Sequence, residues 1–117
     1  MNILVLAAHP DDEVLGMGGT IKKFTKKGYS VKIVIFATGI SARRSSNYKN
    51  AENYNVGKKI ISQMNKQIEK LKIDAKSASK ILGVSDIEFL DFPDNEMDLV
   101  SNLEITKRIE KIIKKFQ

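Results

Sequence analysis

The sequence predicts an α/β fold, a Rossmann-like three-layer α/β/α arrangement around a parallel sheet that is truncated to about three strands. Apolar runs alternate with helical patterns along the chain, which is the order typical of parallel sheets. The first run, residues 3–8, has no polar alternation and therefore indicates a strand buried on both faces. The chain has 117 residues, of which 42% are hydrophobic, so residues 1–117 are expected to form one small globular domain.

The first third of the chain reads as strand, helix and strand. A loop over residues 9–16 follows the first strand, and a helix is expected to begin at Gly18 and to end at Gly28, after a pair of lysines typical of a helix C-terminus. Residues 31–37 are apolar except for Lys32 and predict the second strand. Residues 38–56 are rich in Ser, Asn and Arg and show no periodicity, which predicts a mobile loop.

The rest of the chain predicts two helices and one strand. Residues 87–90 form a short third strand, and Ser101 and Glu104 have the spacing of a capping box at the start of the last helix. The inward face of this last helix is expected to carry Leu103, Ile109, Ile112, Ile113 and Phe116. Before the strand, apolar residues at alternating steps of three and four predict one buried face of a long helix that ends at Gly83: Ile61, Met64, Ile68, Leu71, Ala75, Ala78 and Leu82.

The composition narrows the chemistry of any site. The chain has no cysteine, which excludes disulfides and thiolate metal sites, and His9 is its single histidine. A metal ion would therefore be bound by His, Asp, Glu or backbone oxygen. No apolar run approaches the ~18 residues of a membrane span, and the N-terminus lacks the basic region of a secretory signal, so we expect a cytoplasmic protein.

The charged residues are unevenly distributed. The formal net charge is +6, but the lysines recur as pairs at helical spacing and aromatic residues do not alternate with them, which favours solvated helix faces over a nucleic-acid surface. The acidic residues gather in residues 1–13 and 86–98, where no basic residue occurs. Because the carboxyl ends of parallel strands meet at one edge of a sheet, we expect these clusters to converge on a cation-attracting pocket.

The loop after the first strand carries the residues of a metal site. Imidazole and carboxylate are good ligands for Zn²⁺, and His9, Asp11 and Asp12 lie together there. Pro10 keeps the chain from continuing as strand or helix. Two adjacent carboxylates project in different directions, so one can bind a metal while the other acts as a base. The alternative is a surface histidine followed by acidic residues that favour a helix dipole.

Residues 8–21, Ala-His-Pro-Asp-Asp-Glu-Val-Leu-Gly-Met-Gly-Gly-Thr-Ile, closely resemble the opening motif of the PIG-L/LmbE family of zinc-dependent N-acetylglucosamine deacetylases. Residues 75–84 and 90–98 are similar to later segments of the family, so the resemblance covers nearly the whole chain. It implies a hydrolase that removes the N-acetyl group from a small-molecule amino-sugar conjugate. It also implies that residues 1–117 are the N-terminal part of a deacetylase domain.

The resemblance implies a role for six residues. His9 and Asp12 would bind Zn²⁺ or another divalent metal, and Asp11 would be the general base that activates water. Asp94 would contact sugar hydroxyls. Lys72 lies near the place where family members carry an arginine, and it could supply the charge without the bidentate geometry. Arg43 or its neighbour Arg44 would contact substrate, or would belong to a solvated basic loop.

The resemblance also predicts what the chain lacks. The third metal ligand of the family is a histidine from a later motif, and this chain has no second histidine. Two ligands hold zinc weakly, because catalytic zinc takes three protein ligands and water. A three-stranded sheet also leaves an edge strand open. We therefore expect a fragment of marginal stability that is inactive alone, with a missing C-terminal half or a second copy as its partner.

Two other functions remain open at this point. The chain could be a non-catalytic or degenerate binding protein with the same fold, because its metal shell is incomplete. It could also be a nucleotide-binding module, because the glycine-rich run of residues 16–19 follows a strand and opens a helix. Against this, the spacing differs from Gly-x-Gly-x-x-Gly, and three carboxylates in the same loop repel phosphate.

Overall fold

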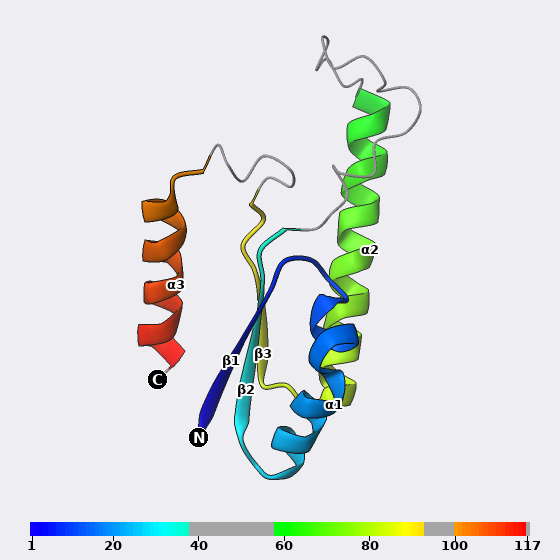
Figure 1. Cartoon of the computed structure of the whole chain (residues 1–117). Coiled ribbons are helices and arrows are strands. Elements are labelled where there is room, and N and C mark those ends of the chain that lie inside the picture. Colours follow the sequence, from blue (N-terminus) through cyan, green and yellow to red (C-terminus); the bar gives the residue numbers. More distant parts are fainter. Residues whose placement is uncertain (38–57, 93–99, 117) are drawn as a thin grey trace.

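The computed structural model of the chain describes residues 1–37, 58–92 and 100–116 (Figure 1). Three strands alternate with three helices, which confirms the predicted fold class. The predicted loop over residues 38–56 lies outside the described residues. In chain order, the elements are β1 (Asn2–Ala7), α1 (Asp12–Lys26), β2 (Ser30–Ile35), α2 (Lys58–Leu82), β3 (Asp86–Phe89) and α3 (Asn102–Phe116).

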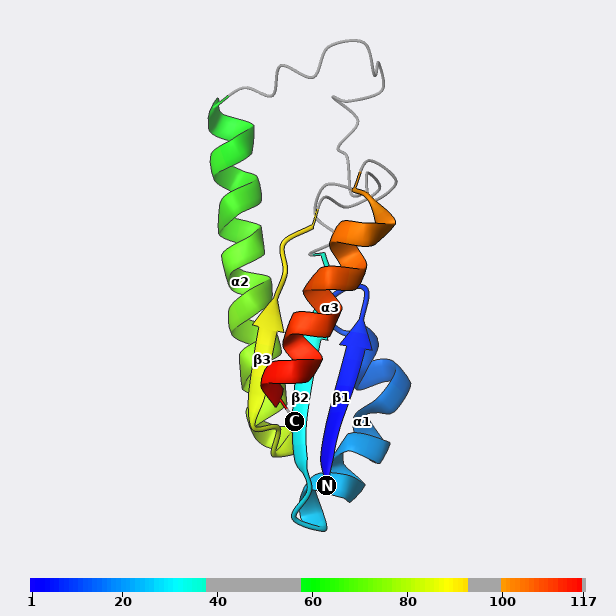
Figure 2. The same ribbon diagram turned by 90° about the vertical axis from the view of Figure 1, so that its left-hand side faces the viewer.

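The three strands form one parallel sheet in the order β1-β2-β3. Ile33 at the middle of β2 lies opposite Val5 of β1 and Ile87 of β3. Helices α1 and α2 cover one face of the sheet, and α3 covers the other (Figures 1 and 2). All three strands therefore end at the same edge of the sheet. Pairing extends beyond the strands, since the N–H of Phe36 donates to the carbonyl of Ala7 at 3.0 Å.

The core lies on both faces of β2, because residues of this strand alternate between the two helix layers. On the α1 and α2 side, six buried residues from β1, α1 and β2 pack together: Val5, Ala7, Ile21, Val31, Ile33 and Ile35. On the α3 side, Val34 packs with Leu90, Phe92 and Ile112. The side-chain amide of Asn2 also donates to the carbonyl of Phe116 at 2.8 Å, so α3 ends beside the start of β1. Among the described residues β1 pairs only with β2, so its outer edge is open, as predicted.

Helix α1 begins six residues earlier than predicted. It starts at Asp12 rather than Gly18, because the carbonyl of Asp11 accepts hydrogen bonds from the N–H groups of Val14 at 3.0 Å and Leu15 at 2.8 Å. Acidic residues in the first turn also favour the positive end of the helix dipole. The glycine-rich run therefore lies inside a helix, and no glycine-rich loop is present there to hold a phosphate.

The predicted buried face is confirmed for α2 but is partly wrong for α3. In α2 the predicted stripe is confirmed from Met64 to Leu82, with Ala75 buried at its centre. In α3, Ile112 is buried, but Leu103 and Ile113 are 62% and 41% exposed, so the prediction that they face inward is wrong. At 100° per residue, Leu103 lies opposite the buried Ile112, and Ile113 lies at the edge of the stripe that contacts the sheet. The Ser101 half of the capping box is confirmed, since its hydroxyl accepts the N–H of Glu104 at 3.1 Å.

Side chains of α1 bind the C-terminal end of α2. The hydroxyl of Thr25 donates to the carbonyl of Leu82, and Nζ of Lys22 donates to the carbonyl of Ile81 at 2.7 Å. These carbonyls have no partner within a helix that ends there. Gly83 then leaves the helix with a φ of +82°.

None of the described helices is long and apolar enough to cross a membrane.

Replacing Gly83 with Ala is expected to destabilise the chain by at least about 1–2 kcal/mol, the cost of the left-handed backbone for a residue with a Cβ. The new Cβ would also lie 3.0 Å from Oγ1 of Thr25, which would have to move away from the carbonyl that it binds. Urea unfolding measures the change. Gly19→Ala is the matched control, because Gly19 lies in a helix with nothing within 4 Å of its Cβ position, and it should stabilise by about 0.5–1 kcal/mol. Equal stability of Gly83→Ala and the parent chain would contradict this account.

Candidate metal centre

His9 and Asp12 face each other across a tight turn that follows β1. The N–H of Asp12 donates to the carbonyl of His9 at 3.2 Å, and the N–H of His9 donates to Oδ2 of Asp12 at 3.0 Å. These two bonds close the turn around Pro10. They bring Nδ1 of His9 to 3.8 Å from Oδ2 of Asp12, with the two side chains 41% and 48% exposed. Both predicted ligands therefore lie side by side and accessible at the carboxyl edge of the sheet.

This pair fits a divalent metal as two of its ligands. A histidine nitrogen at up to about 2.1 Å and a carboxylate oxygen at up to about 2.2 Å from one Zn²⁺ can be no more than about 4.3 Å apart, and the 3.8 Å separation of the His9 and Asp12 atoms lies within that limit. In residues 1–37, 58–92 and 100–116, no three His, Cys, Asp or Glu side chains form a group that could hold an ion. The described residues thus contain the two predicted ligands of a site that ordinarily needs three.

Asp11 lies between the two predicted ligands in an unusual conformation. Its φ of 97° and ψ of −29° place it in the left-handed region, which costs a residue other than glycine about 1–2 kcal/mol. It occupies the N-cap position of α1, yet its side chain makes no capping hydrogen bond. A carboxylate that does not cap its own helix, on an exposed residue, is available to accept a proton from water.

The motif also contains a residue to which the sequence assigned no role. Glu13 is only 2% exposed, whereas Asp11 and Asp12 are exposed. Its Oε2 accepts the N–H of Asp11 at 3.0 Å. Burial raises the pKa of the Glu13 carboxyl above its ordinary value, although hydrogen bonds from the backbone oppose the shift. In the sequence a run of three acidic residues looks uniformly solvated, and only the early start of α1 turns the third inward.

Of the three predicted substrate residues, Lys72 alone lies in the part of the chain that the structure describes. Asp94 and Arg43 lie outside the described residues. Lys72 is described, and its Nζ contacts Oδ1 of Asp91 at 2.9 Å and Oδ2 at 3.0 Å, while lying 5.5 Å from the centre of the Phe89 ring. Asp91 follows the carboxyl end of β3, so Lys72 belongs to the same edge as the turn. Its contact with substrate stays a prediction.

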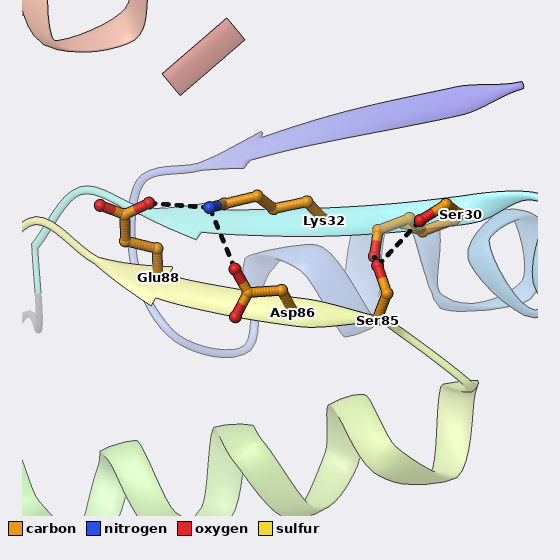
Figure 3. A network of polar contacts seen from close by, with 6 residues as sticks. Ser30, Lys32, Ser85, Asp86 and Glu88 are labelled. Carbon is orange, nitrogen blue, oxygen red and sulfur yellow. Dashed lines mark hydrogen bonds and ion pairs between the residues drawn. The ribbon is translucent and has the colours of Figure 1, made fainter. Parts of the chain in front are cut away.

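The predicted convergence of the two acidic clusters is wrong for Asp86 and Glu88. Both carboxylates lie 3.0 Å from Nζ of Lys32 on the central strand (Figure 3). They belong to β3 itself, and Lys32 shares the α3-facing side of β2 with Val34. Burial by itself lowers the pKa of Lys32, but hydrogen bonds to Glu88 and Asp86 outweigh it, so the pKa is raised above its ordinary value. These two carboxylates neutralise a buried lysine and take no part in the candidate site.

The fold and the turn together define a Rossmann-like α/β protein with a His–Asp pair at the carboxyl edge of its sheet. The family model described as GlcNAc-PI de-N-acetylase (PIG-L) matches residues 4–117, so the chain belongs to the PIG-L family. This confirms the resemblance that was based on residues 8–21, 75–84 and 90–98.

Two curated relatives and a solved structure agree with this family. The chain is 33% identical over 113 residues to diacetylchitobiose deacetylase of Thermococcus kodakarensis, covering 97% of this chain and 36% of that protein. It is 28% identical to probable N-acetyl-alpha-D-glucosaminyl L-malate deacetylase 2 of Bacillus cereus, covering 96% and 46%. The structure of N,N'-diacetylchitobiose deacetylase from Pyrococcus horikoshii matches with a TM-score of 0.71 and 27% identity, covering 97% and 37%. The chain thus spans less than half the length of these relatives.

Proposed function

We propose that the chain supplies two metal ligands and the general base of an N-deacetylase that acts on a substrate containing N-acetylglucosamine. The observation that carries this proposal is the turn after β1, where His9 and Asp12 lie 3.8 Å apart with Asp11 between them. The names of the relatives support the substrate class, because each is a deacetylase of an acetylated amino sugar. Activity is proposed for the PIG-L protein to which these residues contribute.

The residues of the turn divide the work of amide hydrolysis. His9 and Asp12 would hold a divalent ion, which when bound supplies a Lewis acid for the acetamide carbonyl. The Asp11 carboxylate takes a proton from water as the water oxygen bonds to the acetyl carbon. The same carboxyl returns the proton to the nitrogen as the C–N bond breaks. Acetic acid and a free amine are the products, the acid then passes its proton to the amine or to solvent, and Asp11 ends in its starting state.

A non-catalytic PIG-L protein is the second candidate function. It is favoured by one observation, namely that the described residues contain no third ligand near the His9–Asp12 pair. A chain of this kind would bind a metal or an amino sugar without hydrolysing it. The two candidates differ in whether these residues support turnover once the rest of a PIG-L domain is present.

Acetate release by a chimera distinguishes the two candidates. In the chimera, this chain replaces the 113 matched residues of the Thermococcus kodakarensis enzyme, and zinc and N,N'-diacetylchitobiose are supplied. We expect release of acetate by the chimera and none by the 117-residue chain alone. Asp11→Asn in the chimera should lower kcat by at least about 100-fold, the usual contribution of a general base.

Asp74→Asn is the matched control for the chimera, because Asp74 is exposed on α2, and it should leave kcat unchanged. A folded chimera that binds zinc but releases no acetate would contradict the deacetylase proposal. Rapid hydrolysis by the chain alone would instead show that two ligands suffice.

A further inference from the structure

We propose that Glu13 is a positioning residue for Asp11: its buried carboxylate holds the Asp11 amide and thereby fixes the left-handed backbone that directs the general base. The assignment of Asp11 as the base rests on the proposed function. The hydrogen bond and the conformation do not, because both belong to the chain itself. Glu13 is the buried acidic residue of the motif, and neither metal binding nor proton transfer uses it.

The first observation is where the Glu13 side chain points. It lies in the first turn of α1 and is 2% exposed, although its two acidic neighbours are exposed. Its Oε2 is 3.0 Å from the backbone nitrogen of Asp11, two residues earlier in the chain. The side chain therefore folds back over the turn rather than reaching into solvent. A carboxylate is a strong acceptor for a backbone N–H in such a sheltered place.

The second observation is that Asp11 is held at both ends of its backbone. Its N–H donates to Glu13, and its carbonyl accepts from Val14 at 3.0 Å and Leu15 at 2.8 Å. An aspartate rarely adopts a φ of 97°, and the surrounding bonds must maintain it. Because φ and ψ set the direction of the Cα–Cβ bond, these bonds decide where the Asp11 carboxylate points. Removing Glu13 frees φ while leaving the carbonyl side in place.

The third observation is that the neighbouring carboxylate holds a different part of the turn. Asp12 accepts the N–H of His9, and so orders the two metal ligands against each other. Apart from its own backbone N–H, the backbone group that the Glu13 carboxylate holds is the amide of Asp11. Loss of Glu13 should therefore disturb the base without disturbing the ligands, which a general loss of folding would not do.

The test uses the 117-residue chain and NMR. Glu13→Leu removes the acceptor but suits a buried position, and Glu13→Gln retains an acceptor oxygen. In Glu13→Leu we expect the Asp11 amide proton to exchange with solvent at least about 10-fold faster than in the parent chain, as for loss of a hydrogen bond to a charged group. The three-bond HN–Hα coupling of Asp11, which reports φ, should change as well. Glu13→Gln should restore both signals.

Three controls separate positioning from a general structural role. Exchange of the Leu15 amide, which donates to the carbonyl of Asp11, should be unchanged in every variant. Zinc affinity of Glu13→Leu should remain within about 3-fold of the parent chain, whereas loss of the fold would move it much further. Glu104→Gln changes an acidic residue in the first turn of α3 and should affect neither the Asp11 amide nor its coupling.

Unchanged exchange at Asp11 in a folded Glu13→Leu chain would overturn the proposal, and so would failure of Glu13→Gln to restore it. If Glu13→Leu does not fold, the parent chain decides, because its Asp11 amide must exchange far more slowly than an exposed loop amide. Rapid exchange there would equally overturn the proposal. A parent chain that binds no zinc would contradict the proposed function, while the exchange of the Asp11 amide would still decide the role of Glu13.

Discussion

Zinc affinity is expected to fall by at least about 100-fold when His9 is replaced by Ala. Mutating a residue that only orients a metal ligand already lowers metal affinity by about 10–100-fold, and His9 would be a ligand itself. The chain contains no other histidine, so nothing of the same chemistry can replace the imidazole. The remaining Asp12 carboxylate would then bind the ion alone, as an exposed surface carboxylate does. Isothermal titration calorimetry with Zn²⁺ gives the affinity and the number of ions per chain.

Asp12→Asn should lower zinc affinity to a similar extent, because the amide is a poor metal ligand and carries no charge. Asp74→Asn removes an equal charge from an exposed position of α2 and should leave zinc binding unchanged. Binding of zinc by His9→Ala with the affinity of the parent chain would show that the ion is held elsewhere.

The double variant Asp86→Asn/Glu88→Gln is expected to lower the free energy of unfolding by about 2–3 kcal/mol, since removing the partners of a buried charge leaves that charge uncompensated. The side chain of Lys32 is 9% exposed, and its ammonium lies 3.0 Å from both carboxylates. Lys32→Met should cost less than about 1 kcal/mol, because the two carboxylates that remain are partly exposed and can be hydrated. Urea unfolding measures both variants.

The matched control for this prediction is Glu69→Gln/Asp74→Asn, which removes two charges from exposed positions of α2 and should change stability by less than about 0.5 kcal/mol. If the Asp86 and Glu88 variant is no less stable than this control, the two ion pairs of Lys32 drawn in Figure 3 contribute nothing to the free energy of unfolding.

The same network predicts how stability depends on pH. The folded chain raises the pKa of Lys32 above its ordinary value of 10.5, so the folded state retains this proton to higher pH than the unfolded state. The stabilisation is therefore complete below pH 10.5 and is lost as pH rises through the folded pKa. The difference in stability between the parent chain and Lys32→Met should accordingly shrink as the pH is raised above about 10.5.

The parts of the fold that depend on periodicity could be predicted from the sequence. The mostly apolar residues 31–37 predict a strand, and the stripe from Met64 to Leu82 predicts a helix face that packs against the sheet. The start of α1 could not be predicted, because glycines disfavour a helix locally, whereas the bonds to the Asp11 carbonyl arise only from the folded turn. The ion pairing of Lys32 could not be predicted either, because it depends on the register between β2 and β3.

The candidate site was predictable in its donors but not in its arrangement. The residue types of His9, Asp11 and Asp12 and their place after a buried strand point to a metal site, and the resemblance to the family selects His9 and Asp12, which the turn brings together. The burial of Glu13 and the left-handed backbone of Asp11 are consequences of the same turn that no pattern of residue types reveals. The pairing of Lys72 with Asp91 likewise depends on how α2 lies beside β3.

The central claim is that His9 and Asp12 bind one divalent ion together, and the NMR signals of the His9 imidazole during a zinc titration test it most directly. Because His9 is the single histidine of the chain, these signals report on one residue. We predict that they shift and saturate at one ion per chain, at zinc concentrations at least about 100-fold lower than in Asp12→Asn. Signals that do not move, or that move identically in the parent chain and in Asp12→Asn, would contradict the claim.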